Sequence, residues 1–574
     1  MCQIEKYKSI YFISFQYTKE SGENVKPKFL VVFEYNSKNL KQYNENDLNN
    51  LIEHPFNDYE TSIFLMAYAY NDVSCFLELG WSIPHYIIDV YSEWRVFTNS
   101  NITNSSDTIW DRESKSIDLN YYFGATSSIL SKDCNIECEK YFIMSEKSCK
   151  IVEKVMYFYE FYKNKLILNQ ALFRGEYIVC LSEIERRGIP IDSNTLIRLR
   201  EKWETIKLSF IEEVDINLKV YQGDKFNTKK FGLFLNSKNI EWPKYKNGSL
   251  LLDDDTFKEM SLKYPDIKPI RDLRKTLSVM KNFKLSVGVD SRNRTCLRPF
   301  ISKTGRNQPS NSSFIFGLPC WMRGLIKPKK GKSLCYIDWS QQEFGIAAAL
   351  SHDENMIKAY ESGDPYMEFA IQAGAAPKDA TKKSHGNIRE QYKTCAIAVQ
   401  YCMGARSLAS RLISTIDVAK NLLNIHKRTY PDYWKWSDKI VDYAFHMRKL
   451  KTKFGWGLHI LNVSDRSKNS LRNFPMQANG SDMLRLACVM MKRKGVSVIA
   501  TVHDAVLIEA NTDCIEANRD EAMAIMGNTS RELLGTLTLR ADSKIIYEGD
   551  RYMDERGRNM WGLMMRKIEG DGDS

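Results

Sequence analysis

The first 300 residues show two different spacings of apolar positions. Short β-rich runs such as 9–13 and 29–33 alternate with polar turns and helical stretches, and this pattern predicts a separate α/β domain over residues 1–165. From about 168 to 295, apolar residues recur between charged ones at helical spacing, which predicts a mostly helical region. A basic helical region of this kind can grip a duplex backbone, although the same pattern is equally typical of a solvated helix face.

Beyond residue 300 the pattern predicts two apolar strands that each end at an aspartate. One strand ends at Asp338 and the other at Asp504. The run 341–350 has helical character, so Asp338 lies at a strand-to-helix junction, where side chains point into a cleft. Carboxylates are the hard oxygen ligands that Mg²⁺ prefers, and two of them on adjacent strands can hold two such ions. The sequence therefore predicts a two-metal site for phosphoryl transfer.

A third segment, 386–401, is predicted to form a helix with candidate functional residues along one face. On a helix Arg389, Lys393, Ile397 and Tyr401 recur every four residues and share one face. Two cations one turn apart, followed by an apolar and an aromatic position, can bind a triphosphate at one end and stack a base at the other. By itself this pattern is also typical of an ordinary amphipathic helix with surface cations.

Composition narrows the class of protein. The chain has 574 residues, 43% of them hydrophobic, which allows two to four domains and argues against disorder. Lys and Arg number 82 against 71 Asp and Glu, and the net charge of +11 suits a polyanionic partner. The 13 cysteines are odd in number and scattered through apolar segments, so we expect reduced thiols and a cytoplasmic protein. No stretch reaches the roughly 18 apolar residues of a membrane span, so no membrane partner is expected.

Taken in order, these segments resemble the family A DNA polymerases, the bacterial polymerase I class, over roughly residues 300–555. The first motif of that family, D-Y-S-Q-x-E, is matched by residues 338–343 with Trp in the Tyr place. The second, R-x-x-x-K-x-x-x-F-x-x-x-Y-G, is matched by 389–402 with Ile in the Phe place and Cys in the Gly place. The third, H-D-E, occurs at 503–505 as His-Asp-Ala.

The resemblance implies a role for each matched residue. Asp338 and Asp504 would be the catalytic carboxylates that bind two Mg²⁺ ions, together with the backbone carbonyl of Trp339. Glu343 would be the steric gate that excludes a 2′-hydroxyl. The residues expected to contact the incoming deoxynucleoside triphosphate are Glu343, Tyr366, Arg389, Lys393, Ile397 and Tyr401. Those expected to contact the primer-template DNA are Arg306 of a T-G-R motif, Asn473 and Gln477 of an N-x-P-M-Q motif, and His503.

Three positions depart from the family's pattern. Ala505 stands where the family usually has a carboxylate, so we expect the site to rely on Asp338 and Asp504, the missing acid being the peripheral one. Ile397 replaces an aromatic residue that packs against the sugar of the incoming nucleotide. Tyr366 falls where many relatives have a phosphate-contacting His.

Family A enzymes commonly carry a proofreading 3′-5′ exonuclease domain before the polymerase. The α/β character of residues 1–165 fits that place, and residues 64–95 resemble exonuclease-like domains of phage-type relatives. The metal site of such a domain needs a D-x-E pair after the first strand and a later Y-x-x-x-D motif. The corresponding segments, 14–16 and 145–149, lack these carboxylates, and Asp72 and Asp89 alone cannot assemble the site. We expect a domain that keeps its fold and has lost its nuclease activity.

The implied fold is a multidomain α+β protein: a right-hand polymerase with palm, fingers and thumb, preceded by an α/β RNase H-like domain of the exonuclease type. The expected segments are 1–165 for the exonuclease-like domain, 166–300 for a mostly helical thumb and the start of the palm, 301–345 for the palm with the first aspartate, 346–460 for the fingers, and 461–574 for the palm with the second aspartate.

The leading interpretation is a monomeric, template-directed DNA polymerase without proofreading. A single-subunit RNA polymerase shares the palm and the H-D pair, but the bulky Glu343 argues against ribonucleotides. A catalytically idle DNA-binding protein descended from a polymerase is the third interpretation. The lost exonuclease residues and Ala505 favour it, whereas both aspartates, Arg389 and Lys393 argue against it.

Overall fold

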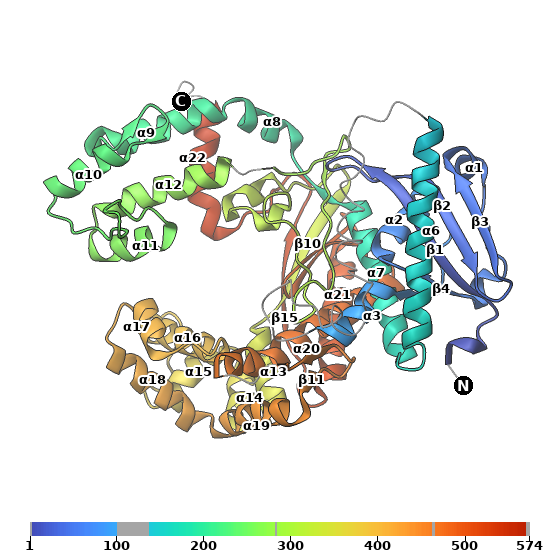
Figure 1. The fold of residues 1–574 in the computed structure, drawn as a ribbon. Helices are drawn as coiled ribbons and strands as arrows, with labels where there is room; N and C mark the ends of the chain where they lie inside the picture. The colour runs from blue at the N-terminus through green and yellow to red at the C-terminus, as the bar shows by residue number, and fades with distance from the viewer. Residues whose placement is uncertain (1–2, 100–136, 282–283, 462–464, 570–574) are drawn as a thin grey trace. The chain divides into compact units, whose positions relative to one another are not determined.

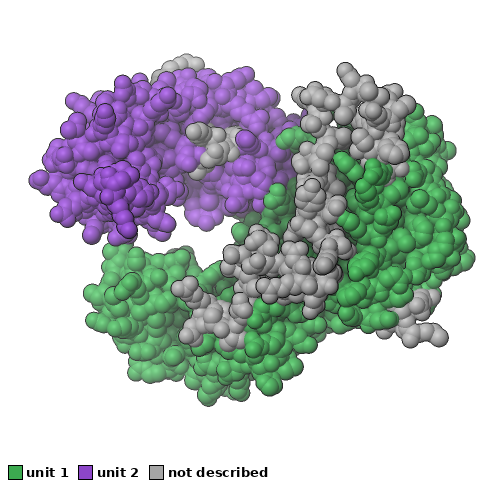
Figure 2. All heavy atoms as spheres, in the orientation of Figure 1, with its two compact units in different colours: residues 1–188, 296–308, 331–545 green, residues 189–295, 309–330, 546–574 purple. Residues whose placement is uncertain are grey.

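The computed structural model describes residues 3–99, 137–281, 284–461 and 465–569. These residues form two compact units (Figure 2). The first unit comprises residues 1–188, 296–308 and 331–545, and the second comprises 189–295, 309–330 and 546–574. None of the helices within the described ranges is both long enough and apolar enough to cross a membrane.

A five-stranded sheet opens the first unit (Figure 1). Its order is β3-β2-β1-β4-β5, with β1 Ile10–Lys19, β2 Val25–Glu34, β3 Asn39–Asn44, β4 Ile63–Met66 and β5 Tyr86–Asp89. The first three strands are antiparallel, whereas β4 and β5 run parallel to β1. Strand β4 is buried along its whole length, as expected for a strand covered on both faces. This mixed sheet matches the expected RNase H-like α/β domain.

Helices cover this sheet. They are η1 Gln3–Lys6, α1 Glu45–Asn50, η2 Tyr59–Thr61, α2 Ala69–Leu79, α3 Val90–Thr98, α6 Glu137–Tyr162 and α7 Leu168–Arg187. Helix α6 packs on β1 and β2, while α7 packs on α2 and β5. Helix α7 also contacts strand β13 Val498–Val502, so this sheet and the C-terminal part of the first unit belong to one compact body.

The second sheet of the first unit carries the predicted catalytic strands. Its order is β13-β14-β10-β15, with β10 Lys332–Trp339, β13 Val498–Val502, β14 Ala505–Asn511 and β15 Ala541–Ile546. Strands β10, β13 and β14 are mostly buried because helices pack on them: α21 Ile515–Leu534 contacts β10 and β14, and α20 Asp465–Arg493 contacts β13. Helix α13 Gln342–Ser351 begins just after β10, as the sequence predicts for a strand-to-helix junction.

A helical group follows α13 in the same unit. It comprises α14 Glu354–Glu361, α15 Pro365–Gln372, α16 Gly386–Gln400, α17 Ala405–Leu412, α18 Ile416–Thr429 and α19 Pro431–Met447, and it ends in a hairpin of β11 Lys449–Lys451 and β12 Gly457–His459. Its core is aromatic: Phe369 contacts the rings of Tyr392, His426 and Tyr430. Burial lowers the pKa of His426 to about 3, so this histidine is a neutral packing residue.

The second unit is mostly helical. Its elements are β6 Ile189–Pro190, α8 Ser193–Glu201, α9 Trp203–Leu218, β7 Tyr221–Gln222, β8 Lys225–Phe226, α10 Thr228–Ser237, α11 Asp254–Lys263, α12 Ile267–Lys281, β9 Arg292–Asn293, η4 Ile315–Gly317, η5 Cys320–Leu325, η6 Glu555–Gly557 and α22 Arg558–Glu569. The helices of the expected thumb that follow Gly188 lie here, whereas α7, which begins the same expected segment, lies in the first unit.

Candidate active site

The two predicted metal-binding aspartates lie at neighbouring strand ends of the second sheet. Strands β13 and β14 form a hairpin whose two-residue turn is His503-Asp504, with Val502 opposite Ala505. Strand β10 pairs with β14 so that Asp338 is the Cα partner of Ala505. His503 has a φ of 56°, in the left-handed region that tight two-residue hairpin turns use. The register therefore places Asp504 beside Asp338.

The two carboxyl groups repel each other in a half-buried environment. Burial raises the pKa of Asp338 to about 7, and the charge of Asp504 and a hydrogen bond between the two groups add to the shift. Burial also raises the pKa of Asp504, while the charges of Arg306 and His503 oppose that shift. The Oδ1 atom of Asp338 is buried and has no hydrogen-bond partner within the described part of the chain. An unpaired buried oxygen beside a second carboxylate fits a divalent cation.

The backbone carbonyl of Trp339 also faces the Asp504 side of strand β10. The next amide, Ser340 N–H, donates to the carbonyl of Arg540, the residue just before β15, with an N···O distance of 2.9 Å. The described chain has no cis peptide bond, and in a trans peptide the C=O points opposite to the N–H. The Trp339 carbonyl therefore points away from β15, toward the side of β10 on which β14 lies.

One acidic residue at this sheet end was not predicted. Asp542, in β15, accepts a hydrogen bond from the Ser340 hydroxyl at 2.5 Å. Its charge is close enough to contribute to the raised pKa of Asp338. In the sequence, Asp542 is one acid in a short strand-forming run at 541–546. This pattern is too common to mark it as a site residue.

Three predicted residues meet at the first turn of α13. Arg306 Nη2 lies 3.0 Å from Glu343 Oε1, and the Tyr401 hydroxyl donates to the same oxygen at 3.3 Å. The arginine is placed by a loop in which Gly305 has a φ of 75°, and a Cβ there would lie 3.0 Å from the Trp456 ring. A residue with a side chain is therefore disfavoured at this position. The proposed steric gate is thus held between two of its predicted neighbours.

The predicted triphosphate cations project from α16 and already have carboxylate partners. Arg389 Nε donates to Asp364 at 2.5 Å, and Arg389 Nη1 donates to Glu390 at 2.8 Å. Lys393 Nζ lies 3.5 Å from Glu390. The guanidinium of Arg389 stacks over the Tyr366 ring at 5.6 Å from its centroid. Neither counter-ion was predicted from the sequence: Glu390 has a readable i,i+3 spacing to Lys393 that was overlooked, whereas Asp364 caps a different helix and has no local signal.

The other predicted contacts lie farther along the first unit. Ile397 is half-buried on α16, one turn beyond Lys393. Asn473 and Gln477 lie one turn apart on α20, and the buried Asn473 Oδ1 has no partner in the described ranges. No hydrogen bond among the described residues joins these two amides to the aspartates. His503 is exposed in the hairpin turn.

Comparison with known proteins identifies this arrangement. The sequence model of DNA polymerase family A matches residues 238–546, more than half of the chain. The chain belongs to DNA polymerase family A. The solved polymerase domain of Pol1 from M. smegmatis, in complex with DNA primer-template and dNTP, shares the fold with a TM-score of 0.71 over 96% of both chains, at 17% identity. The predicted right-hand polymerase fold with a preceding α/β domain is confirmed.

Curated family A relatives match at low identity. DNA polymerase I of Aquifex aeolicus is 23% identical over 65% of this chain and 66% of its own length. The DNA polymerase of Mycobacterium phage L5 is 24% identical over 67% of this chain and 61% of its own. The thermostable DNA polymerase I of Thermus aquaticus is 26% identical over 36% of this chain and 26% of its own. The chain thus spans less than two thirds of the length of these relatives.

In this family A chain, Asp72 and Asp89 of the exonuclease-like region bind backbone groups. Asp72 accepts a hydrogen bond from the backbone N–H of Phe15 at 2.9 Å. Asp89 caps α3 by accepting from Ser92 N–H and also accepts from Ala69 N–H, at 2.9 and 2.8 Å. Burial raises the pKa of Asp72 to about 8 and that of Asp89 to about 7. Each side chain therefore satisfies backbone donors in the core.

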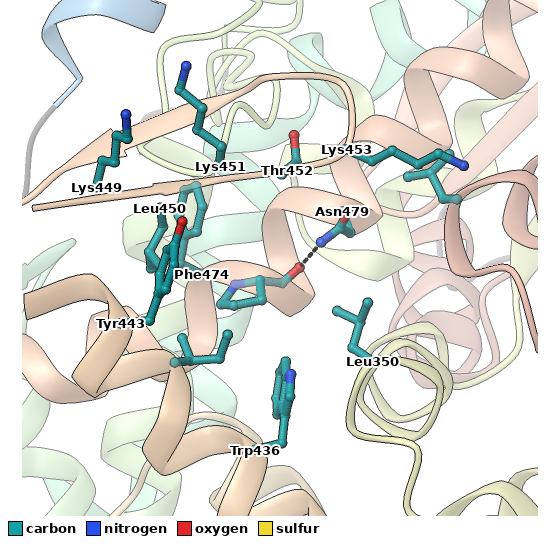
Figure 3. A pocket seen from close by; sticks show the side chains of 13 residues that line it. Leu350, Trp436, Tyr443, Lys449, Leu450, Lys451, Thr452, Lys453, Phe474 and Asn479 are labelled. Atoms are coloured by element: carbon teal, nitrogen blue, oxygen red, sulfur yellow. Dashed lines mark hydrogen bonds between the residues drawn. The ribbon is translucent and has the colours of Figure 1, made fainter. Parts of the chain in front are cut away.

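A pocket of about 380 Å³ in the same unit lies apart from the polymerase aspartates, between β11 and helices α19 and α20 (Figure 3). Leu450 and Phe474 face it, and Trp436 lies across from them. The ammonium groups of Lys449 and Lys451 point away from the cavity. None of the residues predicted to bind nucleotide or DNA lines this pocket.

Proposed function

We propose that this chain is a template-directed DNA polymerase that adds deoxynucleotides to a primer 3′-hydroxyl. The observation that carries the proposal is the strand register that sets Asp338 beside Asp504, because phosphoryl transfer needs paired carboxylates at an accessible strand end. Membership of family A and the primer-template and dNTP of the structural relative support the same class of partners.

In this proposal Asp338, Asp504 and the Trp339 carbonyl hold two Mg²⁺ ions. When bound, these ions activate the primer 3′-oxygen and neutralise the charge of the leaving pyrophosphate. The chain's own residues position the reactants: Arg389 and Lys393 bind the triphosphate and exchange their carboxylate partners for phosphate oxygens.

Glu343 would select deoxynucleotides. Its carboxylate accepts from Arg306 and Tyr401, so its side chain is held in place where the sugar of the nucleotide would lie. A 2′-hydroxyl would have to displace this network. Arg306, Asn473, Gln477 and His503 are proposed contacts of the primer-template duplex, and Ile397 and Tyr366 of the nucleotide.

We also propose that the protein lacks proofreading and acts as a monomer in the cytoplasm. The structural roles of Asp72 and Asp89 support the first of these statements. Incubation with labelled single-stranded DNA and Mg²⁺, without nucleotides, tests it. Magnesium-dependent 3′ shortening that disappears in Asp72→Ala or Asp89→Ala would show that the exonuclease site is intact.

Primer extension tests the polymerase activity itself. The native chain should extend a primer with deoxynucleotides and not with ribonucleotides, and Asp338→Ala should abolish extension while keeping the native melting temperature. Extension with ribonucleotides alone would instead identify an RNA polymerase. No extension by the native chain, or unchanged extension by Asp338→Ala, would contradict the proposal.

A further inference from the structure

Asp542 approaches the catalytic strand end from the flank opposite Asp504. In the sheet order β13-β14-β10-β15, strand β14 lies on one side of β10 and β15 on the other. The hydrogen bond from Ser340 N–H to the Arg540 carbonyl ties the end of β10 to β15, two residues before Asp542. Ser340 directly follows the last residue of β10 and lies two positions after Asp338. Its hydroxyl donates to Asp542, so Asp542 lies next to the strand end that carries Asp338.

Ser340 is held by three hydrogen bonds, and Asp542 makes the one that carries charge. Its N–H donates to the Arg540 carbonyl, and its carbonyl accepts from the Tyr360 hydroxyl at 3.0 Å. The Tyr360 hydroxyl also accepts a hydrogen bond from Arg540 N–H at 3.0 Å. The Ser340 hydroxyl donates to Asp542. This network fixes the peptide plane between Trp339 and Ser340, and so the direction of the Trp339 carbonyl.

The negative charge of Asp542 also compensates for a deficit at the site. Ala505, the Cα partner of Asp338 on β14, carries a methyl group, so the end of β10 and the turn between β13 and β14 supply two carboxylates here, Asp338 and Asp504. Asp542 is exposed, and its charge is close enough to act on Asp338. Within the described ranges, no three or more Asp, Glu, His and Cys side chains are close enough to hold a metal ion together. Asp542 therefore acts from outside the group of direct ligands.

We propose that Asp542 is a positioning residue of the polymerase site: it orients the Trp339 carbonyl through Ser340 and supplies a third negative charge, which raises the affinity of the site for divalent cations. This inference rests on the proposed function. Loss of a residue that hydrogen-bonds to a metal ligand typically lowers metal affinity 10- to 100-fold. Asp542 is exposed, and Asn has the same size as Asp but no charge. We therefore expect Asp542→Asn to lower the affinity for divalent cations about 10-fold, at the low end of that range.

Two measurements on the full chain test the proposal. The first is binding of Mn²⁺ to the free protein, followed by the electron paramagnetic resonance of unbound Mn²⁺. The second is the Mg²⁺ concentration at half-maximal primer extension. Asp542→Asn should weaken Mn²⁺ binding and raise the Mg²⁺ midpoint about 10-fold, with much of the rate recovered at saturating Mg²⁺. Asp417→Asn, which removes an exposed charge from α18 of the same unit, should change neither.

Two further variants separate the hydrogen bond from the charge. Ser340→Ala keeps the charge of Asp542 and should shift the Mg²⁺ midpoint less than Asp542→Asn. Adding Ala505→Glu to Asp542→Asn should restore Mn²⁺ binding, because a carboxylate returns from the other flank.

Unchanged Mn²⁺ binding in Asp542→Asn, or a rate loss that no Mg²⁺ concentration relieves, would overturn the inference. Failure of the native chain to extend a primer would refute the proposed function alone, since the Mn²⁺ comparison still decides the role of Asp542.

Discussion

Replacing Glu390 by Gln should tighten nucleotide binding, because Glu390 holds both cations that are proposed to bind the triphosphate. Its carboxylate lies 2.8 Å from Arg389 Nη1 and 3.5 Å from Lys393 Nζ. Both contacts must be released when phosphate oxygens arrive. The Glu390 side chain is 57% exposed, and ion pairs at such sites contribute about 0.2–1 kcal/mol each. Releasing two of them therefore costs about 0.4–2 kcal/mol, or about 2- to 30-fold in affinity.

The assay is steady-state primer extension over a range of deoxynucleotide concentrations. Glu390→Gln should lower the KM by about 2- to 30-fold with little change in kcat, and the difference should shrink at high salt because ions screen exposed charges. Glu354→Gln is the matched control, since it removes an exposed acid paired with Lys358 on α14. It should leave the KM unchanged. An unchanged or raised KM in Glu390→Gln would refute the argument and show that Glu390 orients the cations productively.

Three other predictions follow from individual contacts. Glu343→Ala should allow ribonucleotide incorporation and free Arg306, measured as the ratio of kcat/KM for ribo- and deoxynucleotides; an unchanged ratio would exclude Glu343 as the gate. The folded-state pKa of Asp72, about 8, lies above the ordinary value of 3.8, so the folded protein binds the extra proton and the free energy of unfolding should fall as pH rises from about 4 to 8. Asp72→Asn should flatten this slope in urea titrations, and an equal slope in both proteins would contradict the assignment. Arg174 donates from Nε and Nη2 to the buried Glu93 carboxylate at 2.6 and 2.7 Å. Arg174→Met removes this partner and should lower the free energy of unfolding by about 3–5 kcal/mol. A loss below about 1 kcal/mol would show that water replaces the arginine.

The sequence predicted the elements of the site better than its contacts. The apolar runs ending at Asp338 and Asp504 are visible because a strand next to a packed helix layer must be apolar along its length. The stripe from Arg389 to Lys393 follows from helical periodicity alone. The contact of Glu390 with Lys393 has the i,i+3 spacing of a helical ion pair and could have been found from the sequence. The contact of Asp364 could not, because it joins the cap of α15 to α16 over 25 positions.

In the exonuclease-like region, too, the sequence showed which residues are present but not what they contact. The absence of the paired carboxylates was evident from the segments themselves. The function of Asp72 and Asp89 was not, because it depends on the backbone N–H groups that the folded chain brings to them. An Asp that accepts hydrogen bonds from backbone N–H groups and an Asp that binds a metal ion cannot be told apart from the local sequence.

The sequence by itself determined the order of the motifs and the residue types in each. It also determined the strand and helix spacings of apolar residues, 2 and 3.6, because these depend on neighbours within a few residues. The tertiary structure decided which strand ends meet. Strand order and register place Asp504 and Asp542 on opposite flanks of Asp338, more than 160 residues away along the chain. Pairing between distant strands is chosen by the burial of the whole sheet against its helices, and no short stretch of sequence contains that information.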